Sequence, residues 1–174
     1  MKKILLALIA PLATASAMAQ SDPLWMRFPA ISPDGKTVAF SYKGDIWTVP
    51  ANGGQARQIT TNPAYDAYPV WSPDSRQIAF ASSREGSMDI YVVGRDGGAP
   101  RRVTTDSGDE YPMAWRNDST IMLKASIMPK ATSIMFADFP QVYEVSANGG
   151  RMRLFSDIPM EDISVGNDGA MLYH

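Results

Sequence analysis

The 174-residue chain contains no cysteine and only one histidine, His174. The lack of cysteine excludes a disulfide-stapled scaffold and any thiol nucleophile. The chain also lacks the G-x-S-x-G sequence of a hydrolase elbow and the D-x-D-x-D-G pattern of a calcium loop. We interpret His174 as an ordinary residue between strands, and we predict no catalytic residue, no metal site and no cofactor in this chain.

Positive charge and long hydrophobic runs are scarce as well. The chain carries 16 basic against 18 acidic residues, a net charge of −2. Nucleic-acid-binding proteins usually show a basic patch, so this balance argues against a nucleic-acid partner. The longest apolar run covers residues 4–12. It is too short for the ~20 residues of a membrane-spanning helix, so we expect no membrane insertion.

The N-terminus has the three-part layout of a secretory signal peptide. Lys2 and Lys3 precede the apolar run, and small residues follow it as far as Ala19. This order predicts a signal peptide over residues 1–19, cleaved after Ala19. Residues 20–174 would then be soluble and either periplasmic or secreted. No cysteine is available for a lipid anchor.

The remaining sequence repeats itself. Residues 30–40 read AISPDGKTVAF and residues 70–80 read VWSPDSRQIAF, at an offset of 40. Self-similarity at this period is typical of propellers and other repeat architectures. Four units follow one another, at residues 28–60, 68–104, 111–155 and, cut short, 161–174. Their turn aspartates are Asp34, Asp74, Asp118 and Asp168, and their double glycines are Gly53-Gly54, Gly97-Gly98 and Gly149-Gly150.

Each unit predicts four short antiparallel strands. Ser-Pro-Asp-Gly suits a tight turn, because proline presets φ and glycine accepts the left-handed conformation. The next strand alternates, with Val38 and Phe40 on one face. A third strand, the Gly-Gly turn and a short last strand complete the unit. We therefore predict an all-β fold of β-propeller blades, about three blades and the start of a fourth, in an incomplete ring.

The later units depart from the pattern. Ser75 and Ser119 replace the turn glycine of the other units, so we expect these turns to be looser or of another type. The third unit also carries an insertion, KASIMPKATSIMFADFP, at residues 124–140. It either packs on its own propeller or forms a docking surface for another domain or subunit. Its apolar residues include Met128, Ile134, Met135, Phe136 and Phe139.

Two acidic pairs and one glycine-rich stretch could suggest a site. Neighbouring residues on a strand point to opposite faces, so neither Asp109-Glu110 nor Glu161-Asp162 forms an acid–base couple. We interpret both pairs as loop residues. The stretch GRDGG at residues 94–98 is predicted to be a hairpin and not a phosphate loop, because no helix follows it.

Aromatic residues recur in the units. In each of the first three units an aromatic residue directly precedes a proline; these residues are Phe28, Tyr68 and Tyr111. Trp71 and Trp115 follow a few positions later in the second and third units. We expect them to pack blade against blade. The alternative is that some line the mouth of the channel and touch peptide.

The repeat motif resembles a known group of propellers. SPDG-x-x-x-AF, D-I-W or D-I-Y, and GG-x-x-R-x-(I/V)-T are similar to the repeats of TolB, prolyl-oligopeptidase propellers and tricorn proteases. The stretches LWMRFPAISPDG and TTNPAYDAYPVWSPD resemble the start of exported bacterial tricorn-like serine proteases. That resemblance implies a propeller that filters peptides or unfolded proteins on their way to a downstream catalytic domain. It leaves assembly as a homo-oligomer open.

Two other functions stay open from the sequence. One is a non-catalytic, TolB-like periplasmic binding propeller; the other is the propeller of an α/β-hydrolase-type peptidase. Because about three blades cannot close a ring, we expect the chain to be the N-terminal piece of a longer protein. We also expect residues 20–174 alone to be inactive and not to form a soluble monomer that unfolds cooperatively.

Overall fold

The computed structural model describes residues 25–125, 140–156, 158, 160–166 and 168–174, and all regular elements in this part are β-strands. The first sheet contains β1 (Arg27–Ile31), β2 (Thr37–Tyr42), β3 (Asp45–Pro50) and β4 (Arg57–Gln58). The second contains β5 (Asp66–Trp71), β6 (Gln77–Glu85), β7 (Ser87–Gly94) and β8 (Gly97–Arg102). The third contains β9 (Glu110–Asn117), β10 (Thr120–Ala125), β11 (Gln141–Ser146) and β12 (Arg153–Ser156), and the fourth contains β13 (Ile163–Val165) and β14 (Met171–Tyr173).

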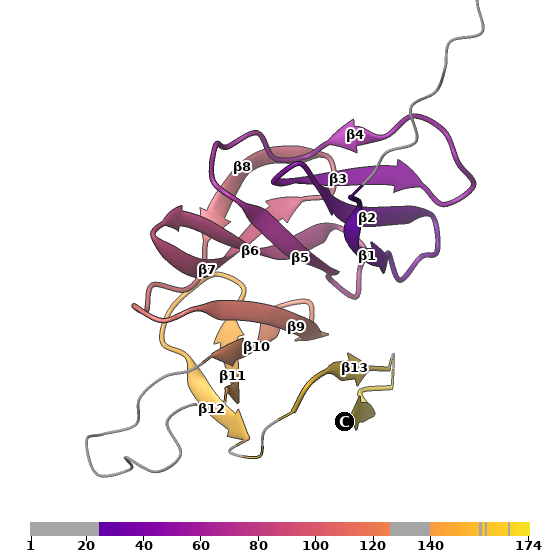
Figure 1. Cartoon of the computed structure of the whole chain (residues 1–174). Coiled ribbons are helices and arrows are strands. Elements are labelled where there is room, and N and C mark those ends of the chain that lie inside the picture. The colour runs from indigo at the N-terminus through magenta and orange to yellow at the C-terminus, as the bar shows by residue number, and fades with distance from the viewer. Residues whose placement is uncertain (1–24, 126–139, 157, 159, 167) are drawn as a thin grey trace, which may run out of the picture.

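Each of the first three sheets is a four-stranded antiparallel meander in chain order, and β13 and β14 form a two-stranded hairpin. The sheets follow one another in an arc, with the first strands on its inner side (Figure 1). The predicted all-β propeller fold is confirmed. The four sheets do not close into a ring within the described residues. The predicted signal peptide, residues 1–19, and most of the predicted insertion, residues 126–139, lie outside the described residues.

The Ser-Pro-Asp-Gly turn between β1 and β2 is closed by side-chain hydrogen bonds. Ser32 Oγ donates to Asp34 Oδ1 at 2.6 Å, and the Thr37 N–H donates to Ser32 Oγ at 3.0 Å. The Lys36 N–H also donates to Asp34 Oδ1, at 3.0 Å. Gly35 adopts φ +69°, the left-handed conformation that glycine tolerates best. The motif therefore specifies a rigid turn through both its side chains and its glycine.

The prediction of a looser turn at Ser75 is wrong. Ser75 adopts φ +59°, and its N–H donates to the Ser72 carbonyl at 2.8 Å, the same distance as in the first turn. The reason lies in the neighbouring blade. Ser75 Oγ accepts the backbone N–H of Asp34 at 3.0 Å. A glycine could not make this contact, so the serine offsets its backbone strain by joining two blades.

The third turn does differ in geometry from the first two. Ser119 is not in the left-handed region, and Asn117 Oδ1 accepts both its N–H and its hydroxyl at 2.9 Å. The contact between turns is nevertheless kept. The Asp74 N–H donates to Asp118 Oδ1 at 3.1 Å. A carboxylate thus does here what the Ser75 hydroxyl does between the first two blades.

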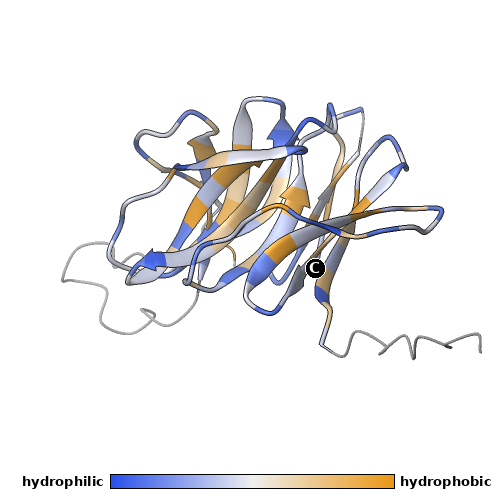
Figure 2. Cartoon of the chain, turned by 90° about the horizontal axis from the view of Figure 1, so that it is seen from above, coloured by the Kyte–Doolittle hydropathy of each residue, from blue (hydrophilic) through white to orange (hydrophobic). Residues whose placement is uncertain are grey.

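Three apolar cores lie between adjacent sheets of the described residues, and the smallest, which includes Met122 and Ile163, joins β9–β12 to β13. The first joins β1–β4 to β5–β8 and includes Ile46, Ile78 and Phe80, all fully buried. The second joins β5–β8 to β9–β12 and includes Ile90 and Leu123, also fully buried. Figure 2 shows hydrophobic residues along the strands and hydrophilic residues at the turns. Because a sheet buries its face only against its neighbour, each blade depends on the next for stability.

Tryptophans fix the spacing of the inner strands. Trp71 Nε1 donates to the Ala30 carbonyl at 3.0 Å, and Trp115 Nε1 donates to the Val70 carbonyl at 3.2 Å. Both indoles are buried, so each fills the core between two blades while its N–H is satisfied by the preceding inner strand.

We predict that Ser75→Ala lowers the free energy of unfolding by about 1–2 kcal/mol, because the Asp34 N–H loses its acceptor. Ser75→Gly should lower it less, since glycine relieves the left-handed strain. Urea unfolding followed by tryptophan fluorescence measures both changes. The matched control is Ser119→Ala, an exposed turn serine without an interblade bond, which should change stability by about 0.5 kcal/mol or less. Equal stability of Ser75→Ala and the parent protein would contradict the assignment.

Candidate functional site on the channel wall

The first strands of the four sheets form one continuous wall. Consecutive members of the series β1, β5, β9 and β13 contact one another, and each pairs with only one strand of its own sheet. Two hollows of about 570 Å³ each lie along this wall. Ala30, Val70 and Met113 line both hollows. The two hollows are therefore the two ends of a single concave surface, which we call the channel wall.

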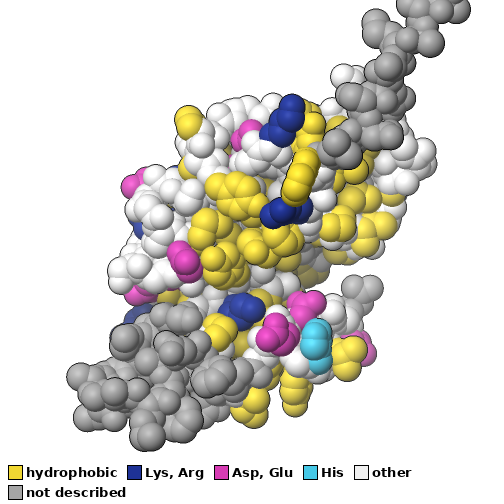
Figure 3. All heavy atoms as spheres, in the orientation of Figure 1, with side chains coloured by type: hydrophobic (Ala, Val, Ile, Leu, Met, Phe, Trp, Pro, Cys, Tyr) yellow, Lys and Arg dark blue, Asp and Glu magenta, His cyan; other side chains and the backbone are white. Residues whose placement is uncertain are grey.

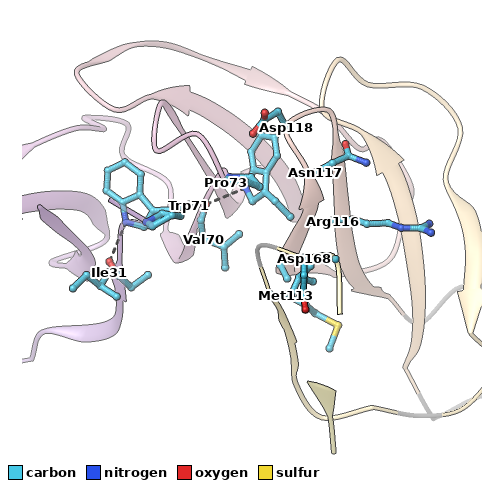
Figure 4. Close-up of a pocket in the computed structure, with 16 residues that line it drawn as sticks. Ile31, Val70, Trp71, Pro73, Met113, Arg116, Asn117, Asp118 and Asp168 are labelled. Carbon is cyan, nitrogen blue, oxygen red and sulfur yellow. Dashed lines mark hydrogen bonds between the residues drawn. The ribbon is translucent and has the colours of Figure 1, made fainter. Parts of the chain in front are cut away.

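The first hollow lies at the end of the wall where the Ser-Pro-Asp turns gather (Figure 4). Ile31, Val70 and Met113 supply apolar surface, while Asp118 and Asp168 lie near its edge. The nearby Arg116 points away from the hollow in Figure 4 and pairs with Glu144. The charged groups of this end are thus partly engaged in structural contacts.

The second hollow contains a row of aromatic rings. The ring centroids of Phe28 and Tyr68 are 3.9 Å apart, and those of Tyr68 and Tyr111 are 5.2 Å apart. Each ring comes from the start of a different inner strand. Lys124, Glu161 and Asp162 also line this hollow, and the two carboxylates belong to the segment that leads into β13.

The expectation that the aromatic residues pack blade against blade is confirmed. The tryptophans are buried between blades, and the rings of Phe28, Tyr68 and Tyr111 stack on one another from three successive blades. These three also line the second hollow, where Tyr68 keeps 37% of its surface exposed, and their contact with peptide stays a prediction. Figure 3 shows hydrophobic side chains gathered near the middle of this face, with acidic side chains and the histidine below them.

The interpretation of Glu110 as a loop residue is wrong. Glu110 is the first residue of β9 and is fully buried. Thr104 Oγ1 donates to Glu110 Oε2 at 3.0 Å, while burial raises the pKa of this carboxyl group to about 7. Strand β9 begins at Glu110, one residue before the predicted repeat unit. This earlier start places the Glu110 side chain in the junction between the second and third blades. The neighbouring Asp109 caps β7 by accepting the Met88 N–H at 2.9 Å.

The other sequence-predicted residues have structural positions. Glu161 and Asp162 lie in a loop, and the Glu161 N–H donates to the His174 carbonyl at 2.8 Å. The glycine-rich stretch at residues 94–98 forms the β7–β8 hairpin. Its Arg95 donates to Thr37 Oγ1 at 2.9 Å and so ties the second blade to the first.

Sequence reasoning missed two buried ion pairs. Arg84 contacts Asp66 at 2.7 Å, and Arg102 contacts Asp89 at 2.9 Å; both carboxylates are fully buried. Burial raises the pKa of Asp89, and the Arg102 hydrogen bonds partly oppose that rise. The recurrence of aspartate within the third strand of each blade, as Asp45 in β3 and Asp89 in β7, was the available signal for the second pair. These pairs lie between strands and not on the channel wall.

The described residues hold no group of three or more potential metal ligands among histidine, cysteine and the acidic residues. No helix in the same part of the chain is long and apolar enough to cross a membrane. The channel wall offers apolar, aromatic and charged surface for binding. Among the described residues, no serine, threonine, cysteine or histidine lines either hollow.

Residues 23–174 match the family model of the tricorn protease N-terminal β-propeller domain. The chain belongs to this family. It is 35% identical over 65 residues to "Tricorn protease homolog 1" of Streptomyces coelicolor, covering 37% of this chain and 6% of that protein. It is 33% identical over 69 residues to "Dipeptidyl-peptidase 5" of Porphyromonas gingivalis, covering 34% of this chain and 10% of that protein.

The relatives of this tricorn-type propeller are therefore peptidases, and the chain spans about 6% to 10% of their lengths. Among solved structures, TolB from Acinetobacter baumannii superposes with a TM-score of 0.66 at 21% identity, covering 86% of this chain and 37% of that one. That likeness supports the propeller fold. The predicted resemblance to tricorn proteases is confirmed by the family match.

We predict that Glu110→Gln stabilises the propeller above neutral pH. The folded-state pKa, about 7, lies above the ordinary 4.5, so stability contributed by the neutral acid is complete below pH 4.5 and lost as the pH rises through 7. Glutamine stays neutral, so the variant should gain on the order of 2 kcal/mol at pH 8 and little at pH 4.5.

Urea unfolding at pH 4.5 and pH 8 measures this difference. Glu161→Gln is the matched control, because Glu161 is exposed. It should leave the pH dependence unchanged. The same stability gain at both pH values for Glu110→Gln would contradict the raised pKa of Glu110.

Proposed function

We propose that this chain is the N-terminal propeller of an exported, serine-type, tricorn-like peptidase, and that its channel wall filters peptides bound for a catalytic domain elsewhere in the protein. The observation that carries the proposal is the family match over residues 23–174, together with the peptidase relatives. The described residues provide a concave wall without catalytic groups. A filtering role fits such a surface.

The geometry of the wall supports extended substrates. The inner strands β1, β5 and β9 each leave one edge unpaired by their own sheet, and such edges offer backbone N–H and C=O groups. The hollows alternate apolar surface with charged groups. An unfolded chain can present its backbone and separate side chains to this wall, whereas a folded domain is too wide to enter a hollow of this volume.

We predict that the intact protein hydrolyses flexible peptides and unfolded proteins, and leaves folded proteins intact. A quenched fluorogenic decapeptide and casein serve as unfolded substrates, and native ubiquitin serves as the folded one. Treatment with a serine-directed fluorophosphonate should abolish hydrolysis and label the protein outside residues 20–174. Cleavage of native ubiquitin at the rate of casein would contradict filtering.

The second candidate is a non-catalytic, TolB-like binding propeller, which the structural likeness to TolB favours. The same assay separates the two. A pure intact protein that binds the decapeptide but does not hydrolyse it, even with no inhibitor present, would support the binding propeller and overturn the peptidase.

Export is the remaining part of the proposal. We predict that the mature protein begins at Gln20 and is recovered from the periplasm or the medium, because residues 1–19 carry the layout of a signal peptide. N-terminal sequencing of the native protein after cell fractionation measures both. An N-terminus at Met1 in the cytoplasmic fraction would contradict export.

A further inference from the structure

The aromatic row is held in an unusual backbone conformation. Phe28 and Tyr68 adopt φ +53° and +56°, in the left-handed region that side chains with a Cβ rarely occupy. Each lies in an irregularity of its strand pairing, between Arg27 and Ala30 or between Ala67 and Val70. Bulges of this kind re-aim a side chain out of the regular pleat.

The same strain occurs at equivalent positions of two blades. A regular strand would avoid the backbone strain at Phe28 and Tyr68. Because the strain recurs in two blades, we attribute the aromatic row to the repeated blade structure and not to one local sequence. The result is that Phe28, Tyr68 and Tyr111 lie side by side along the hollow, one from each blade. Tyr111 Oη donates to Asp109 at 3.5 Å, which anchors that end of the row.

The repeat continues the row with a different kind of residue. Aligning the third unit (YPMAWRNDS) with the fourth (EDISVGNDG) places Glu161 where Tyr111 stands. Glu161 and its neighbour Asp162 line the same hollow, and both are exposed. Among the described residues that line the hollow, Lys124 is the only basic one, so these residues carry an excess of negative charge at one end.

We propose that this hollow binds a peptide segment in which an aromatic residue is followed by lysine or arginine. The aromatic side chain stacks on the row, and the basic side chain reaches the carboxylates of Glu161 and Asp162. Tyrosine faces favour both partners, since they stack with aromatic rings and attract cations. Charge complementarity selects a basic over an acidic segment.

The inference rests on the proposed function, because it takes the channel wall as the surface that peptides meet. It is tested by binding and not by hydrolysis, so the two can fail separately. The probe is a fluorescein-labelled, acetylated decapeptide of glycine and serine with a central Phe-Lys pair. Two matched peptides carry Phe-Glu or Gly-Lys instead. Fluorescence anisotropy on the intact protein at 4 °C gives the affinities, and mass spectrometry checks that each peptide stays uncut.

We expect Tyr68→Ala to weaken binding of the Phe-Lys peptide about tenfold, through loss of the central ring. Tyr68→Phe keeps the ring and should retain binding, which separates recognition from folding. Tyr65→Ala is the matched control, because Tyr65 is an exposed tyrosine, 43% accessible, outside the hollow. It should leave the affinity unchanged.

We expect Glu161→Gln to weaken binding of the Phe-Lys peptide about threefold to fivefold. Binding of the Phe-Glu peptide should stay unchanged or become slightly tighter. Glu85→Gln, an exposed carboxylate on β6 away from the hollow, serves as the charge control. Equal affinity for the Phe-Lys, Phe-Glu and Gly-Lys peptides would overturn the inference. So would an unchanged affinity in Tyr68→Ala, even if the intact protein proves to be a peptidase.

Discussion

The structure depends on contacts between blades more than on contacts within them. A four-stranded sheet has two faces and can bury them only against its neighbours. Fully buried side chains from consecutive sheets, such as Ile46 against Phe80 and Ile90 against Leu123, make up the two main cores. The channel wall exists because these cores set the sheets side by side with their first strands inward.

Directional contacts add precision to this apolar packing. The turn of one blade donates a backbone N–H to a side chain of the next, at Ser75 in one junction and at Asp118 in the other. The indoles of Trp71 and Trp115 join the same junctions at the inner strands. Apolar burial is non-directional and allows neighbouring blades to slide past each other. Hydrogen bonds at the turns and at the inner strands fix the angle between neighbouring blades. The spacing of the aromatic row follows from that angle.

The interior and the channel wall differ in how their carboxylates are held. Within the second blade, buried Asp66 and Asp89 are each paired with an arginine, while Glu110 at the start of the third blade has only a threonine donor and is held with a raised pKa. On the wall, Glu161 and Asp162 stay exposed and available to a ligand. The fold therefore neutralises the carboxylates that it buries and leaves charge where a substrate could meet it.

The sequence by itself determined the repeat, the turns and the fold class. Ser-Pro-Asp-Gly encodes its turn locally, so Ser32, Asp34 and Gly35 could be assigned from their residue types. Only the tertiary structure decided the left-handed conformation of Ser75, the burial of Glu110 and the exposure of Tyr68. Each depends on a residue about 40 positions away or on a one-residue shift at a strand start. Local patterns do not contain that information, because it arises only when two blades are packed together.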